Sequence, residues 1–208
     1  NFTNEGGIEG TTRFLKNITG MWIVENLLGE WAERGTRYGY GDLPGLCGLA
    51  DPFACFIDPD DPAFAHPVSM TAAIGAFCDR TGQARPGSDA AFIRTVFESL
   101  ALRYREVLSQ IVGIADHPVD VLHIIGGGSR NRLLNRFTAN AIGKTVVAGP
   151  AEATAVGNLM LQAYAAGFVR DLPEIRSVIG QSFETEVFTP GDTAAWRDGY
   201  KKYKELLR

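Results

Sequence analysis

The stretch Val121–Asn131, which reads VLHIIGGGSRN, decides the fold of this 208-residue chain. Val121–Ile125 is a short and nearly all-apolar run, which is typical of a parallel-sheet strand that is buried on both faces. Three glycines, Gly126–Gly128, end the run, and we expect a helix from Ser129 to about residue 142. This order of strand, glycine turn and helix predicts a layered α/β fold with a right-handed crossover to the next strand.

Downstream of this stretch, strands and helices continue to alternate. Gly143 is expected to end the first helix. The pattern then predicts, in order, a strand over 144–148, a helix over 152–166, a helix over 172–179 that starts at a proline, a strand over 184–188 and a terminal helix from about Thr193.

Upstream of this stretch, the chain is expected to be mostly helical. Apolar residues at 3.6-residue spacing predict helices over 21–34, with Gly35 as the stop, and over 89–115. Ser69 is a candidate cap for a helix that runs to about Arg80, and Ser88 or Asp89 for the long one. The remaining predictions are a strand over 12–18 and, in the Gly- and Pro-rich stretch 36–67, only a short helix over 43–50 and a short strand over 54–57.

The segment Asp58–Pro62, which reads DPDDP, predicts a turn. Its three acids resemble a metal site at first sight, but its two prolines keep the chain from wrapping around an ion. We therefore interpret the segment as a solvated turn.

Charge and composition exclude two classes of partner. The chain has 20 Lys and Arg against 24 Asp and Glu, so it offers no basic surface for nucleic acid or for an anionic membrane. No window of ~18 uninterrupted apolar residues is present, so no membrane span is expected. The start, Asn1–Gly7, lacks the features of a signal peptide, and the missing initiator Met suggests a processed chain or a piece of a longer one.

Cysteines and histidines argue for a reduced, cytoplasmic protein without a metal site. The three cysteines show no Cys-x-x-Cys spacing and are odd in number: Cys47, Cys55 and Cys78. The three histidines show no metal-ligand spacing: His66, His117 and His123. His123 lies in an apolar run, so we expect it to be a core residue.

The glycine turn is the strongest candidate for a binding site. Glycines let the backbone turn sharply and let a flat or charged ligand approach closely. The following helix adds N–H groups and the positive end of its dipole, which suit an anion. The alternative is a tight turn without a ligand.

Two familiar phosphate motifs do not fit. The dinucleotide motif requires glycine where Asn131 stands, and in the P-loop register of Gly143–Thr145 the first glycine is replaced by Thr138. The amide of Asn131 both donates and accepts, which suits a purine or ribose edge. Asn17, near the start of the chain, is as consistent with a turn or cap residue as with a ligand contact.

Several segments resemble a known family. They are NFTNEGGIEGTTRFLKNITGMW (Asn1–Trp22), HIIGGGSRNRLLN (His123–Asn135), AGPAEATAVGN (Ala148–Asn158), FIDPDDPAF and FESLALRY. GGGSRN and GPAEATAVGN resemble the FGGY group of carbohydrate kinases. The NEGG…LKN opening narrows the resemblance to the rhamnulokinases of that group.

The resemblance implies a two-domain α/β fold like that of actin, hexokinase and the heat-shock ATPases, each domain having a ribonuclease H-like core with a mixed sheet flanked by helices. Residues 1–208 correspond to the C-terminal, nucleotide-binding domain, and the partner is an N-terminal kinase domain. The implied reaction transfers the γ-phosphate of ATP, with Mg2+, to the 1-hydroxyl of L-rhamnulose. Xylulose, fuculose and glycerol stay open as substrates within the group.

Site residues follow from the resemblance position by position. Gly127, flanked by Gly126 and Gly128, matches the nucleotide-binding glycine motif, and Asn131 matches an asparagine beside the adenosine. Asn17 matches a sugar-binding position. These roles are implied by the family and not by the spacing.

Two positions depart from the family pattern. Glu25 stands where a glutamine that contacts ATP is expected, and a carboxylate there repels a triphosphate. Cys78 matches a family cysteine, but the partner position holds Thr95, so no disulfide is implied.

Other parts of the family's active site have no counterpart in these residues. The catalytic Asp that takes the sugar proton, the Asp-x-Gly phosphate loop and a Ser-Gly-Thr turn all belong upstream of Asn1. Phosphoryl transfer depends on positioning and charge stabilisation, so we expect the chain alone not to phosphorylate a sugar. A non-catalytic nucleotide-binding module is the alternative, and a dehydrogenase cofactor domain is disfavoured by Asn131.

Overall fold

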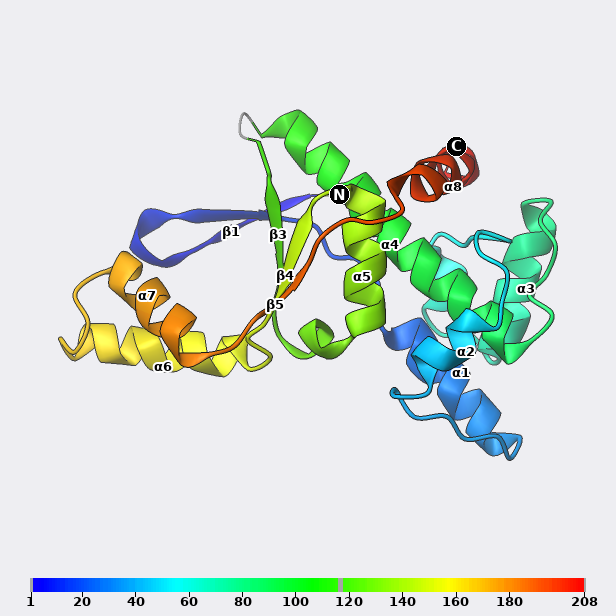
Figure 1. Cartoon of the computed structure of the whole chain (residues 1–208), viewed down its shortest axis with the longest axis horizontal. Helices are drawn as coiled ribbons and strands as arrows, with labels where there is room; N and C mark the ends of the chain where they lie inside the picture. Colours follow the sequence, from blue (N-terminus) through cyan, green and yellow to red (C-terminus); the bar gives the residue numbers. More distant parts are fainter. Residues whose placement is uncertain (1, 116–117, 208) are drawn as a thin grey trace. The chain divides into compact units, whose positions relative to one another are not determined.

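The structure, a computed structural model, describes residues 2–115 and 118–207 and divides into two compact units (Figure 1). The first unit comprises Asn1–Ile114 and Arg197–Arg208, and the second comprises Ala115–Trp196. Two residues named from the sequence, Asn1 and His117, lie outside the described residues. In the described ranges, no helix combines the length and the apolar character that crossing a membrane requires.

Helices dominate the first unit, and their predicted positions are confirmed to within a few residues. They are α1 (Trp22–Glu33), α2 (Leu43–Gly48), α3 (Met70–Arg80) and α4 (Asp89–Ile114), together with α8 (Thr193–Leu206) from Arg197 onward. The Ser69 hydroxyl accepts a hydrogen bond from the backbone N–H of Ala72 across 3.1 Å, and that of Ser88 accepts one from Ala91 across 3.2 Å. Both caps therefore form as the sequence predicts.

The apolar faces of these helices form the core of the first unit. α1 packs against α3 and α4, and α2 packs against α4. The fully buried side chains recur at helical spacing, as an amphipathic helix requires; they include Ile23, Val24, Leu27, Ile74, Ile93, Val96, Phe97 and Leu100.

A two-stranded hairpin precedes α1. β1 (Thr3–Gly6) pairs antiparallel with β2 (Thr12–Leu15), with Asn4 opposite Phe14. The strand predicted over 12–18 is thus real but ends three residues early, and Asn17 lies in the irregular segment that follows it.

The strand predicted over 54–57 is wrong. Residues 55–57 are buried, as an apolar run demands, but no strand of the described residues pairs with them. Side chains satisfy the backbone instead: Phe53 N–H donates to Glu98 across 2.7 Å, Phe56 N–H to Gln83 across 2.8 Å and Ile57 N–H to Ser99 across 3.0 Å. A buried backbone needs hydrogen-bond partners, and here polar residues of α4 and of the loop after α3 supply them.

The turn at Asp58–Pro62 is confirmed, with a 3.0 Å hydrogen bond from Asp61 N–H to the Asp58 carbonyl. It is not a solvated turn, however. Asp60 lies 2.8 Å from the buried Arg103, and Asp61 lies 2.6 Å from Arg80. Within the described residues, no three His, Cys, Asp or Glu side chains cluster in a way that could hold a metal ion.

The second unit contains the predicted alternation of strands and helices. Its elements are β3 (Val121–Ile124), α5 (Arg132–Ile142), β4 (Thr145–Ala148), α6 (Ala153–Ala165), α7 (Leu172–Ser182) and β5 (Glu186–Phe188). β3 and β4 are parallel, with Leu122 opposite Val146, and β5 pairs antiparallel with β4, so the sheet is mixed. Its small core is formed by Ala139, Val146, Ala148 and Phe188.

Three expectations for the second unit are corrected. His123, which was expected to be a core residue, is exposed on β3. β3 is not buried on both faces: it is an edge strand in the described sheet, and its residue Val121 is 40% exposed, as is Ile125 just after the strand at 60%. The helix predicted to open at Ser129 opens at Arg132, because a separate 3-10 turn, Gly127–Arg130, comes first. Gly143 ends this helix in the left-handed conformation, as predicted.

Candidate functional site

The glycine turn lies at the carboxyl end of β3, where the chain leaves the sheet. Gly126 has φ 75° and ψ −166°, a conformation that only glycine adopts without strain. Its N–H donates to the Pro150 carbonyl across 3.0 Å, and Gly149 N–H donates to the Ile124 carbonyl across 2.8 Å. The turn is therefore tied to the loop that follows β4.

Ser129 closes the 3-10 turn that follows. Its N–H and its hydroxyl both donate to the Gly126 carbonyl, across 3.0 Å and 2.7 Å. Asn131 N–H then donates to the Gly128 carbonyl across 3.1 Å. These bonds give the glycine turn one defined conformation.

Asn131 caps the next helix. Its side-chain oxygen accepts a hydrogen bond from Leu134 N–H across 3.0 Å at the first turn of α5. The residue predicted to read a nucleoside edge therefore also fixes where α5 begins.

Asn135 supports the turn from inside and was not predicted from the sequence. It is fully buried, and its amide donates to the Ser129 carbonyl across 2.8 Å. Its only sequence signal was a polar residue on the apolar face of a helix. Burial of such a residue costs free energy unless it is hydrogen-bonded, so its partner marks a structural role.

The chain's own packing requires glycine at one position of the turn but not at the other two. A Cβ added to Gly127 or Gly128 meets no atom within 4 Å, and neither residue has the positive φ of Gly126. The missing side chains therefore leave open space outside the turn. Space of this kind suits a ligand that approaches the backbone closely.

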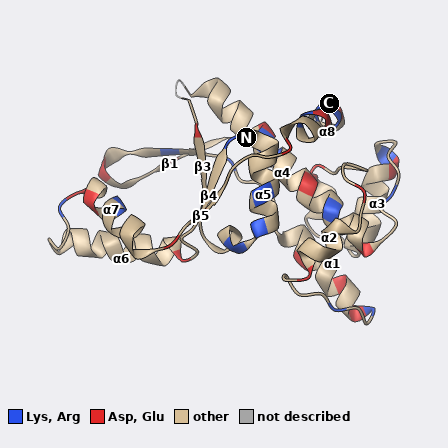
Figure 2. Cartoon of the chain, viewed as in Figure 1, with Lys and Arg blue, Asp and Glu red and all other residues tan. Residues whose placement is uncertain are grey.

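Two arginines belong to this region: Arg130 ends the 3-10 turn, and Arg132 opens α5, on which Figure 2 shows basic residues in blue. Arg130 lies 3.1 Å from Glu152, with both side chains more than 70% exposed, and Arg132 lies 2.5 Å from Glu186. Exposed ion pairs of this kind contribute little to stability. Both guanidinium groups can therefore change partner at small cost.

The other two predicted residues lie in the first unit. Asn17 is exposed in the segment between β2 and α1, and it does not cap α1, whose N-cap position is Met21. Glu25 is in the first turn of α1, and its carboxylate accepts a hydrogen bond from the Tyr40 hydroxyl across 3.1 Å. Burial, and then this bond to Glu25, raises the pKa of Tyr40.

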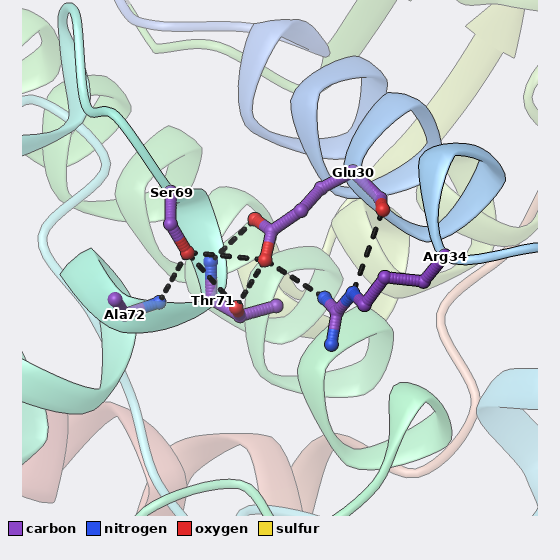
Figure 3. A network of polar contacts seen from close by, with 5 residues as sticks. All are labelled: Glu30, Arg34, Ser69, Thr71 and Ala72. Atoms are coloured by element: carbon purple, nitrogen blue, oxygen red, sulfur yellow. Dashed lines mark hydrogen bonds and ion pairs between the residues drawn. The ribbon is translucent and has the colours of Figure 1, made fainter.

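Glu25 also lines a cavity of about 350 Å³ with residues of α1 and of the segment before α3, among them Trp22, Asn26 and Val68. Next to it, a polar network joins α1 to α3 (Figure 3). Glu30 accepts hydrogen bonds from the Thr71 hydroxyl across 2.5 Å, from Thr71 N–H across 3.1 Å and from Ser69 across 3.0 Å. The helix that carries Glu25 is held to α3 by these bonds.

With this geometry established, the chain can be assigned to a class of protein. Residues 1–166 match the model of the C-terminal domain of the FGGY family of carbohydrate kinases. The chain belongs to that family.

Individual relatives are more specific. The chain is 47% identical over its whole length to a rhamnulokinase of Bacteroides thetaiotaomicron, of which it covers 42%. It is 41% identical over 90% of its length to a rhamnulokinase of Enterococcus faecalis and 39% identical over 92% to one of Bacillus subtilis, covering 38% and 39% of them. The chain thus spans about two fifths of the length of these curated relatives.

Two solved structures share the fold. A xylulose kinase of Lactobacillus acidophilus matches 99% of the chain with a TM-score of 0.69 at 17% identity, over 41% of its own length. A xylulose kinase of Rhodospirillum rubrum matches 94% with a TM-score of 0.63 at 20% identity, over 38% of its length. The predicted α/β fold of the actin and hexokinase type, with a mixed sheet flanked by helices, is confirmed.

Proposed function

We propose that this chain is the ATP-binding, C-terminal half of an ATP-dependent carbohydrate kinase that phosphorylates L-rhamnulose at its 1-hydroxyl. The observation that supports it most directly is the open space beside Gly127 and Gly128, which the chain's own packing does not need. In the first turn of a helix the N–H groups have no intrahelical acceptor. Those of Gly127 and Gly128 are the donors that we assign to ATP.

Asn131 and the neighbouring arginines complete the proposed nucleotide contacts. Asn131 sits at the N-terminus of α5, where the helix dipole favours negative charge. Arg130 and Arg132 are exposed and held only by surface ion pairs, so they can turn towards phosphate oxygens. Gly126 sets the direction of the backbone that carries these groups.

Asn17 and Glu25 are the proposed contributions of the first unit, Asn17 to the sugar and Glu25 to ATP. The negative charge of the Glu25 carboxylate repels a triphosphate. The Tyr40 hydroxyl donates a hydrogen bond to this carboxylate, and we propose that the bond partly compensates its negative charge and so weakens the repulsion.

Within the described residues, no three His, Cys, Asp or Glu side chains form a group that could hold a metal ion by themselves. We propose that Mg2+ arrives bound to the phosphates of ATP and is held from outside these residues. What this chain supplies is backbone and side-chain hydrogen bonding to the nucleotide.

L-Rhamnulose is the proposed sugar because the relatives at 39–47% identity are named rhamnulokinases. The xylulose kinases match at 17–20% identity and support the fold alone. The chain covers about two fifths of the rhamnulokinases, and the resemblance implies that the family's catalytic Asp belongs outside these residues, so we propose that the 208 residues alone do not turn over sugar. Its three free cysteines fit the reducing conditions of the cytoplasm, where we place the protein.

Calorimetric titration of the chain with ATP and magnesium tests the nucleotide site. We expect binding that Gly127→Val abolishes while the far-ultraviolet circular dichroism stays unchanged. Unaltered ATP binding by Gly127→Val overturns the site assignment.

A second assay tests the substrate. The full-length parent protein is offered L-rhamnulose, xylulose, fuculose and glycerol with ATP, and we expect the highest kcat/KM on rhamnulose. Preference for another sugar reassigns the substrate, and ATP binding without any phosphorylation identifies a non-catalytic nucleotide-binding module.

A further inference from the structure

Two of the three cysteines are in contact, although they are 23 positions apart in the sequence. Cys55 lies in the irregular segment before the Asp58 turn and Cys78 near the end of α3, and an interaction between the two thiols is the largest influence on the pKa of each. Both are free thiols, and both are buried, at 4% and 0% exposure. Thr95 of α4 also contacts the Cys55 sulfur, with 3.1 Å between Oγ1 and Sγ.

One residue holds the backbones of both cysteines in place. Gln83 N–H donates to the Cys78 carbonyl across 2.8 Å. The side chain of Gln83 accepts from Phe56 N–H across 2.8 Å and donates to the Phe56 carbonyl across 2.9 Å. Because Phe56 follows Cys55 directly, these bonds hold the segment that carries Cys55 near the end of α3 that carries Cys78.

Cys55 lies in the wall of a cavity. Cys55 lines a space of about 280 Å³ together with Ala84, Arg85, Pro86, Thr95 and Glu98, whereas Cys78 is not part of its wall. Ala84 and Arg85 are exposed, so the cavity reaches the surface. A small molecule that enters it meets the sulfur of Cys55 first.

The pKa values of the two thiols also distinguish Cys55, which lines the cavity, from Cys78. The interaction with Cys78, supported by Thr95, lowers the pKa of Cys55 despite its burial. The same interaction and burial raise the pKa of Cys78. Thiolates are the nucleophilic form of cysteine, so Cys55 is the attacking group and Cys78 the second partner.

We propose that Cys55 and Cys78 form an oxidisable dithiol, in which a small hydroperoxide entering the cavity oxidises Cys55 and Cys78 converts the product to an intrachain disulfide. In the first step the Cys55 sulfur attacks the peroxide oxygen, the O–O bond breaks, and sulfenic acid and water form from hydrogen peroxide. In the second step the Cys78 sulfur attacks the sulfenic sulfur, the S–O bond breaks, and a second water leaves. The two thiols lose two electrons and two protons, and the peroxide is reduced to two waters.

This pair is distinct from the one that the family resemblance implies, because position 95 is a threonine. The disulfide would link the irregular segment before the Asp58 turn covalently to α3. Neither cysteine belongs to the glycine turn of the second unit, so the proposal does not rest on the proposed ATP contacts of that turn.

The test treats the folded protein with hydrogen peroxide, blocks remaining thiols with an alkylating reagent and maps the peptides by mass spectrometry. We expect free thiols to fall from three per chain to one and a linked peptide pair that contains Cys55 and Cys78. Dithiothreitol is expected to restore all three thiols. The circular dichroism spectrum shows that the protein remains folded throughout.

Variants separate the two steps. Cys78→Ser is expected to leave Cys55 as a sulfenic acid that dimedone traps. Cys47→Ser is the matched control: burial raises the pKa of that thiol to about 11, and the 55–78 link should still form without it. Each of three results in the wild type would overturn the proposal: three unmodified thiols in the folded protein, a link that involves Cys47 or a second chain, or a link that appears only in denaturant. These results need only the wild type, so the test holds even if Cys78→Ser does not fold.

Discussion

The buried amide of Asn135 donates a hydrogen bond to the carbonyl oxygen of Ser129 across 2.8 Å, so a residue inside α5 holds the glycine turn that precedes the helix. The side-chain oxygen of Asn135 has no hydrogen-bond partner among the described residues. The structural role of the Asn135 side chain therefore lies in its NH2 group, which donates to the turn.

Asn135→Leu removes this donor with little change in volume. We expect the free energy of unfolding to fall by about 1 kcal/mol, because Ser129 loses its partner while the unpaired oxygen also disappears. ATP affinity should fall as well, since the turn is loosened. Urea denaturation and calorimetric titration measure the two effects.

Asn140→Ala is the control for that variant. Asn140 lies on the same helix but accepts a hydrogen bond from Gly191 N–H across 2.8 Å, away from the glycine turn. It should cost stability and leave ATP affinity unchanged. If Asn135→Leu binds ATP as the wild type does, Asn135 does not position the turn.

The three glycines of the turn should respond differently to alanine. Gly126→Ala forces a side chain into a conformation reserved for glycine and should cost about 1–3 kcal/mol of unfolding free energy. Gly128→Ala meets open space and should change it by less than about 0.5 kcal/mol. Equal losses for the two variants in urea denaturation would contradict this account of the turn.

The Glu30 network of Figure 3 should make stability depend on pH. Burial raises the pKa of Glu30, but the hydrogen bonds from Thr71 and Ser69 and the charge of Arg34 outweigh it, so the pKa lies below its ordinary 4.5. A carboxylate with a lowered pKa stabilises the folded state above its unfolded pKa, and this stabilisation disappears as the pH falls through the folded value.

Glu30→Gln should therefore cost about 1.5–3 kcal/mol at pH 7, as expected for hydrogen bonds to a charged group. The difference from the wild type should shrink as the pH is lowered below 4.5. Chemical denaturation across this range measures it, with the exposed Glu33→Gln as the control. A difference that stays constant with pH rules out the ionised carboxylate as its cause.

Two arginines that pair with the same turn should differ in their effect on stability. Arg103 has a side chain 10% exposed and pairs with Asp60, whereas Arg80 has one 56% exposed and pairs with Asp61. Arg103→Met leaves a partly buried carboxylate without its partner and should cost about 3 kcal/mol. Arg80→Met should cost less than about 1 kcal/mol, and thermal or urea unfolding that ranks them in reverse would refute the assignment.

Local signals in the sequence predicted most of the fold. The helices of the first unit follow from apolar spacing and from the caps at Ser69 and Ser88, which act within one helical turn. The order of β3, glycine turn, α5 and β4 follows from one apolar run and from Gly143. These features depend on neighbouring residues, so they can be read along the chain.

The errors arise where distant side chains replace local partners. The buried run at 55–57 looks like a strand, but Ser99 and Gln83 satisfy its backbone from elsewhere in the fold. The acids at 58–61 look solvated until Arg103 and Arg80 pack against them. Asn135 could not be singled out, since a buried polar residue is recognised only when its partner is known.

The sequence by itself determined the family, the positions of the helices and the place of the glycine turn, because backbone conformation at Gly126 and helix capping are short-range properties. Only the tertiary structure decided which glycines the chain needs for itself, which residue holds the turn, and that Cys55 meets Cys78. Those contacts join residues that are far apart in the chain, and they exist only after the apolar faces of the helices have packed.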